Sequence, residues 1–258
     1  MRGLRVRLWQ GGLLLGLLLL WEWASRTGRI DPFFFSYPSE IASRVFRWFA
    51  TGEIYPHLYV TTVEMLLAFA LGTLLGVALG LWLALAPGPA AVLDPYIKAL
   101  NAIPRVVLAP IFTLWFGLGI LSKVALGITL VFFVAFFNTY QGVKEVPPVV
   151  LQNARLLGAR RSHLLRHVYL PAAASWIFSS LRTSIGFAVI GAVVGEYLGS
   201  AAGLGYLIAQ AEGVFDTTGV FAGMVVLMAF VLVLDALVGA VERRLLVWRP
   251  KEREGGTA

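Results

Sequence analysis

The chain has 258 residues, of which 59% are hydrophobic and only 14% are charged, and its mean hydropathy is +0.80. Soluble globular chains carry roughly 25% charged residues, so this composition excludes an ordinary soluble domain. The net charge of +7 is more typical of basic loops in a membrane protein than of nucleic-acid binding. The absence of cysteine excludes disulfides, a thiol nucleophile and a thiolate metal site.

Long uncharged apolar runs indicate an all-α integral membrane protein. About 20 apolar residues in a helix cross the ~30 Å hydrocarbon core of a bilayer, and a helix satisfies its own backbone hydrogen bonds there. The alternating ten-residue strands of a membrane barrel are missing. The six transmembrane helices that we expect are Leu8–Ala24, Thr61–Ala86, Tyr96–Phe116, Leu121–Gln141, Ala172–Tyr197 and Gly219–Val241.

The N-terminus has features of both a signal peptide and a membrane span. Three arginines precede the apolar run, but Trp21, Glu22 and Trp23 stand where small residues would precede a cleavage site. We therefore interpret this segment as an uncleaved first span. Residues 1–60 would comprise this span and an external interfacial segment.

The external segment contains one predicted helix, beginning at Pro38-Ser39. Ile41, Val45, Phe46 and Phe49 would lie along one of its faces. The helix would lie either at the membrane interface or against the other spans, and the sequence leaves both alternatives open.

Glycines at every fourth position predict close helix packing in the second and fifth spans. Small residues at this spacing let the backbones of membrane helices approach each other, a device shared by transporters, channels and enzymes. The glycines concerned are Gly72, Gly76, Gly80, Gly191, Gly195 and Gly199.

Polar and charged residues inside the spans are candidates for a solute pathway, because such groups are costly in a membrane. Pro104 and Pro110 interrupt the third span beside Asn101 and Arg105, and broken helices often line solute pathways; a merely kinked helix is the alternative. The pathway candidates are Asn101, Pro104, Arg105, Asn138, Arg182 and Glu196.

Arg182 has two interpretations. It lies eleven residues beyond Pro171, about 16 Å along a helix and near the middle of the bilayer. It would either pair with Asp235 as a structural ion pair or line the pathway and attract an anion.

The distribution of Lys and Arg predicts the orientation. With the N-terminus inside, fourteen of these residues fall on the inner side and five on the outer side, with Arg105 and Arg182 inside spans. The positive-inside rule then places both termini, and a final tail of residues 245–258, in the cytoplasm.

Several motifs for chemistry are missing. The chain has no P-loop, no H-E-x-x-H and no G-x-S-x-G, so we expect neither a nucleotide site nor a catalytic site in it. His163 and His167 have the spacing of metal ligands, but three arginines surround them and no carboxylate lies near in sequence. We expect no metal site.

The stretch from Asn153 to Pro171, "NARLLGARRSHLLRHVYLP", is basic and lies between two spans. Pro147-Pro148 would begin a helix at Val149 and Gly158 would end it. A second amphipathic piece would follow at Ser162–Leu170, with Pro171 beginning the fifth span. A short helix–Gly–helix of this kind, clear of the bilayer, is suited to docking on another protein.

This stretch resembles the cytoplasmic loop of binding-protein-dependent ABC-importer permeases, which has the form E-A-A-x3-G-x9-I-x-L-P. Gln152, Asn153 and Val168 depart from the pattern, while the spacing from Gly158 to Leu170-Pro171 is intact. The segments "AIPRVVLAPIFTLWFGLG", "SLRTSIGFAVIGAVVGEYLGSAAGLGYLI" and "DTTGVFAGM" resemble the nitrate/sulfonate/taurine branch. The likeness extends from about Tyr37 to Arg244.

The resemblance implies a type I importer permease core at residues 61–244, with a cytoplasmic coupling loop at 145–171. It also implies a solute-binding protein outside, two ATPase subunits that hold ATP and Mg²⁺, a second permease copy that forms a homodimer, and the bacterial inner membrane. The solute would be nitrate, a sulfonate or taurine, or a pyrimidine or riboflavin-type vitamin precursor. A self-contained secondary transporter or channel is the alternative. The residues assigned to ATPase coupling are Gln152, Asn153, Ala154, Arg155, Leu157, Gly158, Ala159, Leu170 and Pro171.

Overall fold

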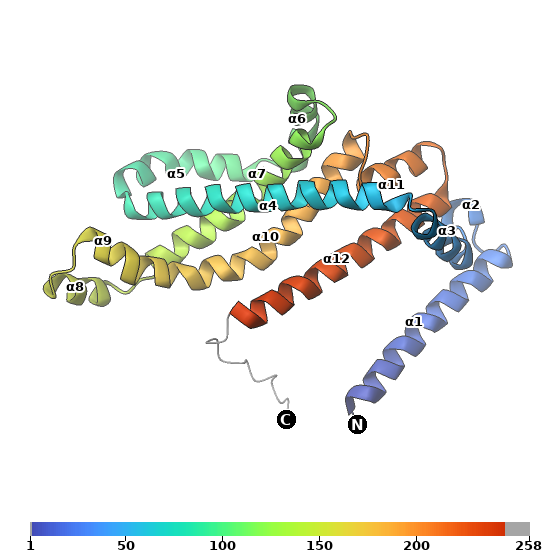
Figure 1. The fold of residues 1–258 in the computed structure, drawn as a ribbon, viewed down its shortest axis with the longest axis horizontal. Helices are drawn as coiled ribbons and strands as arrows, with labels where there is room; N and C mark the ends of the chain where they lie inside the picture. The colour runs from blue at the N-terminus through green and yellow to red at the C-terminus, as the bar shows by residue number, and fades with distance from the viewer. Residues whose placement is uncertain (1, 246–258) are drawn as a thin grey trace.

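The computed structural model describes residues 2–245, and within these residues the chain is built of helices joined by short turns (Figure 1). Of the expected tail, only Leu245 is described; residues 246–258 lie outside the described residues. The helices are α1 (Arg2–Arg26), α2 (Pro32–Phe35), α3 (Pro38–Thr51), α4 (Ile54–Leu85), α5 (Pro87–Ala102), η1 (Arg105–Leu108), α6 (Ala109–Phe116), α7 (Ile120–Lys144), α8 (Pro148–Leu156), α9 (Arg161–Leu164), η2 (Leu165–Tyr169), α10 (Leu170–Leu198), α11 (Leu204–Gly213) and α12 (Thr217–Leu245).

Helices α4, α7 and α10 pack against one another and form the centre of the fold (Figure 1). A Cβ atom at Gly72 would lie 2.7 Å from the Cβ of Val131, and one at Gly76 would lie 2.8 Å from the Cβ of Ala135. Gly191 of α10 lies directly against the backbone of Gly127 of α7. The glycines therefore allow the close helix packing that their spacing predicts, since any larger side chain would separate these helices.

Four helical segments of the described chain are long and apolar enough to cross a membrane. A fifth span exists if α5 and the η1–α6 segment, which are bent by 86° relative to each other, count as one. Helix α1 is not among them, and it carries Arg5, Arg7, Glu22 and Arg26. The expectation of six spans is thus not confirmed. The four are Ile54–Leu85, Ile120–Lys144, Arg161–Leu198 and Thr217–Ala240.

The third expected span, Tyr96–Phe116, is not one continuous helix. Helix α5 ends at Ala102, and Ile103 is extended with ψ at 128°. A residue that precedes a proline is restricted to extended backbone, so Pro104 forces the break here. The prediction of a break around Pro104 is confirmed, and whether the two bent pieces form one span, as expected, stays a prediction.

The helix that contains the fifth span begins earlier than expected. Instead of starting at Pro171, helical backbone runs without a break from Arg161 through the π-helical segment η2 into α10. A proline ring conflicts with the carbonyl four residues before it in a regular α-helix. In this helix the ring of Pro171 would conflict with the carbonyl of residue 167. The wider π turn η2 contains residue 167, so it lies where this conflict would occur.

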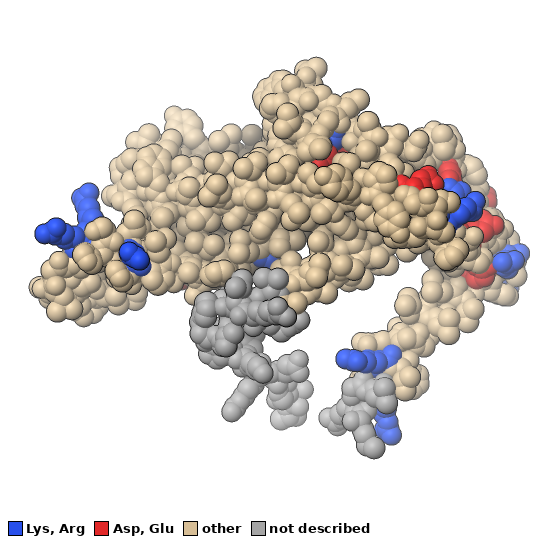
Figure 2. All heavy atoms as spheres, viewed as in Figure 1, with Lys and Arg blue, Asp and Glu red and all other residues tan. Residues whose placement is uncertain are grey.

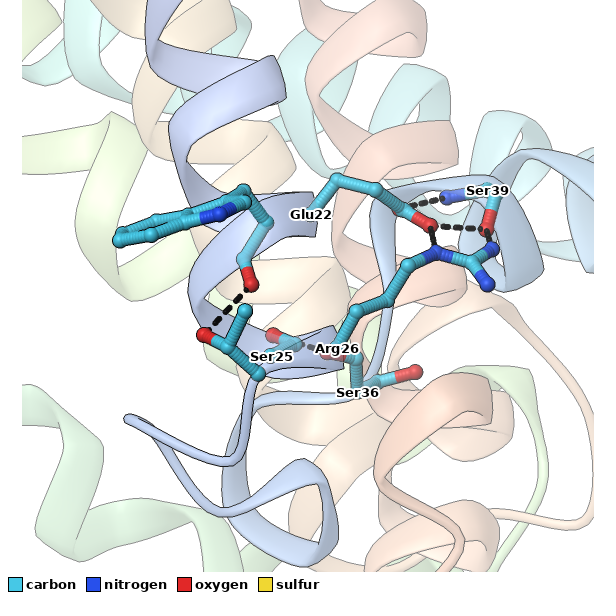
Figure 3. Close-up of polar contacts among 7 residues, drawn as sticks. Glu22, Ser25, Arg26, Ser36 and Ser39 are labelled. Atoms are coloured by element: carbon cyan, nitrogen blue, oxygen red, sulfur yellow. Dashed lines mark hydrogen bonds and ion pairs between the residues drawn. The ribbon is translucent and has the colours of Figure 1, made fainter.

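At the opposite end of the molecule from α8 and α9, polar contacts fasten the end of α1 to α3 (Figures 1 and 3). The Glu22 carboxylate accepts hydrogen bonds from the backbone N–H (3.0 Å) and the hydroxyl (2.8 Å) of Ser39, and it pairs with Arg26 at 2.6 Å (Figure 3). The Ser25 hydroxyl donates to the carbonyl of Ser36 at 3.0 Å. A carboxylate at the start of α3 also favours the positive end of that helix dipole.

Helix α3 packs on α12. Its buried residues are Ile41 and Trp48, and Val45 lies against the same core cluster. The face predicted from the sequence is partly wrong, because the Phe46 and Phe49 side chains are 75% and 40% exposed. Positions i, i+4 and i+7 form the packed stripe, so the structure favours a packed helix over one attached only to the membrane interface.

Candidate coupling loop and membrane-embedded polar groups

The segment between α7 and α10 forms the expected helix–Gly–helix. Helix α8 ends with Gly158 at φ +81°, a left-handed conformation that glycine adopts most readily. The N–H of Gly158 donates to the carbonyl of Arg155 at 2.9 Å, and the N–H of Ala159 donates to the carbonyl of Ala154 at 3.0 Å. This pair of bonds is the Schellman stop of a helix. The sequence correctly predicted where α8 ends.

Apolar side chains on α8 are unusually exposed for so short a helix. Leu156 and Leu157 are 85% and 89% exposed, and Val149 and Val150 are 63% and 45% exposed. The helix lies beyond the end of α7, at one end of the bundle (Figure 1). An apolar surface at such a position is typical of a protein–protein contact.

The residues assigned to coupling do not all lie in the loop between helices. Gln152, Asn153 and Arg155 are exposed on α8, whereas Ala154 and Ala159 are half-buried. Leu170 and Pro171 belong to the first turn of α10. They are continuous with η2 and α9, so a movement of α9 would pass along one helical rod into α10.

The polar groups around the third span come together. Nη2 of Arg105 donates to the side-chain and backbone oxygens of Asn101, which lies across the break at Pro104. The Arg105 guanidinium also lies 4.7 Å from the centre of the Phe133 ring of α7, within the range of a cation–π contact. The broken segment is therefore fastened to α7 by its arginine.

Asn138 of α7 does not join this group. Its side-chain amide donates to the carbonyl of Val134, one turn earlier in the same helix, at 2.8 Å. It is half-buried, so its polar group is satisfied locally.

Arg182 of α10 contacts Asp235 of α12. Nη2 of Arg182 lies 2.9 Å from Oδ1 and 3.1 Å from Oδ2 of Asp235, and Nε lies 3.2 Å from Oδ1. Each side chain is 55% exposed in the isolated chain. The partner anticipated for Arg182 is thus in contact with it, by the forked geometry that makes arginine–carboxylate pairs strong.

Glu196 lies deep in the protein rather than on an open route, since its residue surface is 1% exposed. Its Oε1 accepts from the Thr61 hydroxyl at 2.6 Å and its Oε2 accepts from the N–H of Gly205 at 2.7 Å. The Thr61 oxygen also accepts from the N–H of Leu204 at 2.9 Å. Glu196 and Thr61 therefore hold the beginning of α11 against α4 and α10.

Two further charged residues surround Glu196, and sequence reasoning did not select them as site residues. Glu64 and Lys123 are 1% and 0% exposed, and Lys123 interacts electrostatically with both glutamates. Nζ of Lys123 donates to the carbonyl of Leu118 at 2.6 Å. A charge near the edge of an apolar run resembles a loop residue in sequence. The sequence did contain one signal: Glu64, Lys123 and Glu196 each lie near the outer end of an expected span. Three charges at the same side of the bundle could have been expected to lie close together.

Glycines allow the chain to close over Glu196. Gly203 has φ +118°, and a Cβ atom there would overlap the Glu196 carboxyl group. A Cβ atom at Gly205 would lie 2.9 Å from the Cβ of Glu196. The sequence "GLG" is therefore required by the close approach of this turn to a buried carboxylate.

The remaining polar candidates lie apart. The six pathway candidates fall into separate places: Asn101, Pro104 and Arg105 at the break, Asn138 on α7, Arg182 with Asp235, and Glu196 in the buried cluster. The rings of His163 and His167 are stacked 5.9 Å apart. No group of three potential metal-ligating side chains occurs among the residues that the structure describes.

Comparison with known proteins identifies the family. Residues 48–247 match the family described as "Binding-protein-dependent transport system inner membrane component". The chain belongs to this family. The match spans α4, the broken segment, α7, the α8–α9 loop, α10 and α12, the elements described above.

Individual relatives place the chain within the family. It is 32% identical over 243 residues to a putative aliphatic sulfonates transport permease of Bacillus subtilis, covering 93% of this chain and 88% of the relative. It is 34% identical to a riboflavin transport system permease of Chloroflexus aurantiacus, covering 90% and 87%. The solved inward-facing methionine ABC transporter MetNI contains a chain with the same fold, at TM-score 0.58 and 18% identity, covering 78% of this chain and 95% of that one.

The chain is a permease subunit of an ABC importer of the nitrate/sulfonate/taurine type and a multi-pass inner-membrane protein. Permeases of this family are transport components and not enzymes, and they work with an ATPase and a solute-binding protein. The alternative of a self-contained secondary transporter or channel is set aside by the family match.

Proposed function

We propose that two copies of this chain form a homodimeric permease that is driven by two ATPase subunits, each holding ATP and Mg²⁺. The α8–Gly158–α9 segment would be the surface on which an ATPase subunit docks. A solute-loaded binding protein would deliver the solute to the opposite end. Closure of the ATPase pair would then move the permease between outward-open and inward-open states by alternating access.

The observation that carries the docking proposal is the exposure of Leu156 and Leu157 at 85% and 89%. These leucines sit at a helix end fixed by a Schellman stop, and they lie outside the candidate membrane spans. Leaving them in water is unfavourable, since burying one leucine is worth roughly 1.5–3 kcal/mol. A groove on a partner protein would bury both.

We further propose six spans with both termini in the cytoplasm. Helix α1 would be the first span, and the bent α5–η1–α6 segment would be the third. The charge distribution supports this orientation. In the view of Figure 2, the α8–α9 end carries Lys and Arg but no Asp or Glu, whereas the α2–α3 end carries residues of both charges. Basic residues gather on the cytoplasmic side of membrane proteins.

The solute is proposed to be a small molecule such as nitrate, a sulfonate or taurine, or a pyrimidine or riboflavin-type precursor. The named relatives carry sulfonates in one case and riboflavin in another. The transported solute would be identified as the one whose complex with the binding protein stimulates ATP hydrolysis by the reconstituted transporter. Each should be tested in turn with the same binding protein.

Docking is tested by purifying the ATPase with the permease after replacing the exposed leucines. Leu156→Ser with Leu157→Ser should reduce the co-purified ATPase by at least about tenfold, since two buried leucines are lost from the contact. Leu114→Ser is the matched control, because Leu114 is 83% exposed on α6, away from α8 and α9 (Figure 1). Full recovery of the ATPase with the double variant would refute docking at α8.

A further inference from the structure

Beside the α8–α9 segment, the structure contains a basic cavity of about 490 Å³. It lies between the last turns of α4 and α7 and the helices α8, α9 and η2. Small-molecule sites occupy roughly 300–1,000 Å³, so the cavity can hold a group the size of a lipid headgroup. Its lining consists of Ala84, Leu85, Pro87, Lys144, Arg155, Arg161, Leu164, Leu165 and Tyr169.

Positive charge converges on this cavity from three different elements. Lys144 is the last residue of α7, Arg155 is in the last turn of α8, and Arg161 begins α9. No carboxylate lines the cavity, and within the described chain none of the three makes an ion pair. Three cations that share one cavity repel each other, so an anion bound among them would be favoured.

The other wall of the cavity is apolar and adjoins the ends of two helices that are apolar enough to cross a membrane. Leu85 is the last residue of the apolar helix α4, just as Lys144 is the last residue of α7. Leu164 and Leu165 complete the apolar side. The cavity therefore lies at the ends of two candidate membrane spans and is lined both by three cations and by apolar side chains. A phospholipid would match both parts of this lining, because it joins an anionic phosphate to apolar acyl chains.

We propose that this cavity binds the phosphate group of an anionic phospholipid from the adjacent leaflet. Basic pockets between membrane helices at the interface are suited to such headgroups, and arginine binds phosphate oxygens by its planar fork. The lipid would join the end of α7 to α8 and α9. This inference does not depend on ATPase docking, because it concerns the permease and the bilayer alone.

The test is lipid binding by the full permease chain in detergent, without the ATPase. Phosphatidylglycerol is added, with phosphatidylcholine of the same acyl chains as the uncharged comparison, and the bound lipid is counted by native mass spectrometry. We expect selective retention of phosphatidylglycerol. Arg155→Gln with Arg161→Gln should weaken this binding by about tenfold or more, since each cation near a lipid phosphate contributes roughly 1 kcal/mol.

The matched control is Arg160→Gln with Arg166→Gln, which removes the same charge from the same loop but from residues that do not line the cavity. It should bind phosphatidylglycerol like the unaltered chain. If the double variant at the cavity misfolds, as judged by gel filtration, Lys144→Gln alone serves the same purpose and should give a smaller loss.

Three outcomes would overturn the proposal. Equal weakening by both double variants would mean a diffuse charge effect. Competition by inorganic phosphate at low millimolar concentration would mean a site for a free anion instead of a lipid. Unchanged lipid binding in the cavity variant, combined with loss of ATPase association in the assembled transporter, would assign the cavity to an acidic side chain of the ATPase.

Discussion

Arg182 of α10 and Asp235 of α12 form a forked ion pair whose three contacts are 2.9–3.2 Å long. Nearer the start of α12, Leu227, Phe230 and Leu234 pack against the buried cluster that includes Ala188 and Val189 of α10. Both residues belong to segments apolar enough to span the membrane. Each side chain of the pair is half-exposed in the isolated chain, and each charge neutralises the other.

Removing either member of this pair should reduce folded protein in the membrane. A lone charge near the middle of a membrane helix costs roughly 2.5–3.5 kcal/mol on insertion scales. Arg182→Leu and Asp235→Leu should each lower the amount of inserted protein, and the double variant should recover much of it. Membrane-inserted protein and solute uptake are measured for all three. If Arg182 instead attracts an anionic solute, Arg182→Leu folds normally, transport is lost and the second change rescues nothing.

Gly158 is expected to be needed for coupling because of its backbone conformation alone. No atom lies within 4 Å of a Cβ placed there, but its φ is +81°. A left-handed conformation costs an L-residue other than glycine about 1–2 kcal/mol, and a β-branched residue suffers most. Gly158→Val should leave the protein inserted while uptake and transport-linked ATP hydrolysis are lost.

Asparagine is the control at the same position, because it tolerates the left-handed region better than other residues. Gly158→Asn should therefore retain most transport. Equal activity of the valine and asparagine variants would show that the turn conformation is unimportant for coupling. Gly186→Val controls for glycine loss on α10, where a Cβ also meets nothing within 4 Å.

The turn over Glu196 should be intolerant of a single methyl group. Gly205→Ala would place a Cβ 2.9 Å from the Cβ of Glu196 and against the carbonyl of Val193. Overpacking of this kind typically costs about 1–3 kcal/mol. We expect a clear fall in the melting temperature of the detergent-solubilised protein. Gly213→Ala, at the other end of α11 with no atom within 4 Å, should leave it unchanged, and similar behaviour of the two variants would contradict the close approach.

Features that depend on local sequence were predictable. The apolar runs gave α4, α7 and α12 to within several residues, and Gly158 marked the end of α8. The contact of Arg182 with Asp235 was one of the two alternatives that the rarity of charge in apolar spans suggested. The break at Pro104 followed from proline geometry.

Features that depend on which surface faces lipid were not predictable. In α3, hydrophobic periodicity included Phe46 and Phe49, yet both are exposed. In a membrane protein an apolar side chain can contact lipid as favourably as protein, so hydrophobicity alone does not identify the packed face. Lys123 is one of the five basic residues counted on the outer side, although it lies within the expected span Leu121–Gln141, and only the packing of α4 and α10 around α7 reveals that it is buried.

Orientation in the membrane is tested by introducing single cysteines, because the chain has none. Thr51 at the end of α3 and Ser162 in α9 are both exposed, so a cysteine at either position is accessible to reagent. In intact cells a membrane-impermeant maleimide should label Thr51→Cys and leave Ser162→Cys unlabelled until the cells are opened. Ala68→Cys, at a position with 0% exposure, should remain unlabelled in both conditions. Labelling of Ser162→Cys in intact cells would reverse the orientation inferred from the lysines and arginines, and it would also place the α8 leucines on the side of the membrane where no ATPase can reach them.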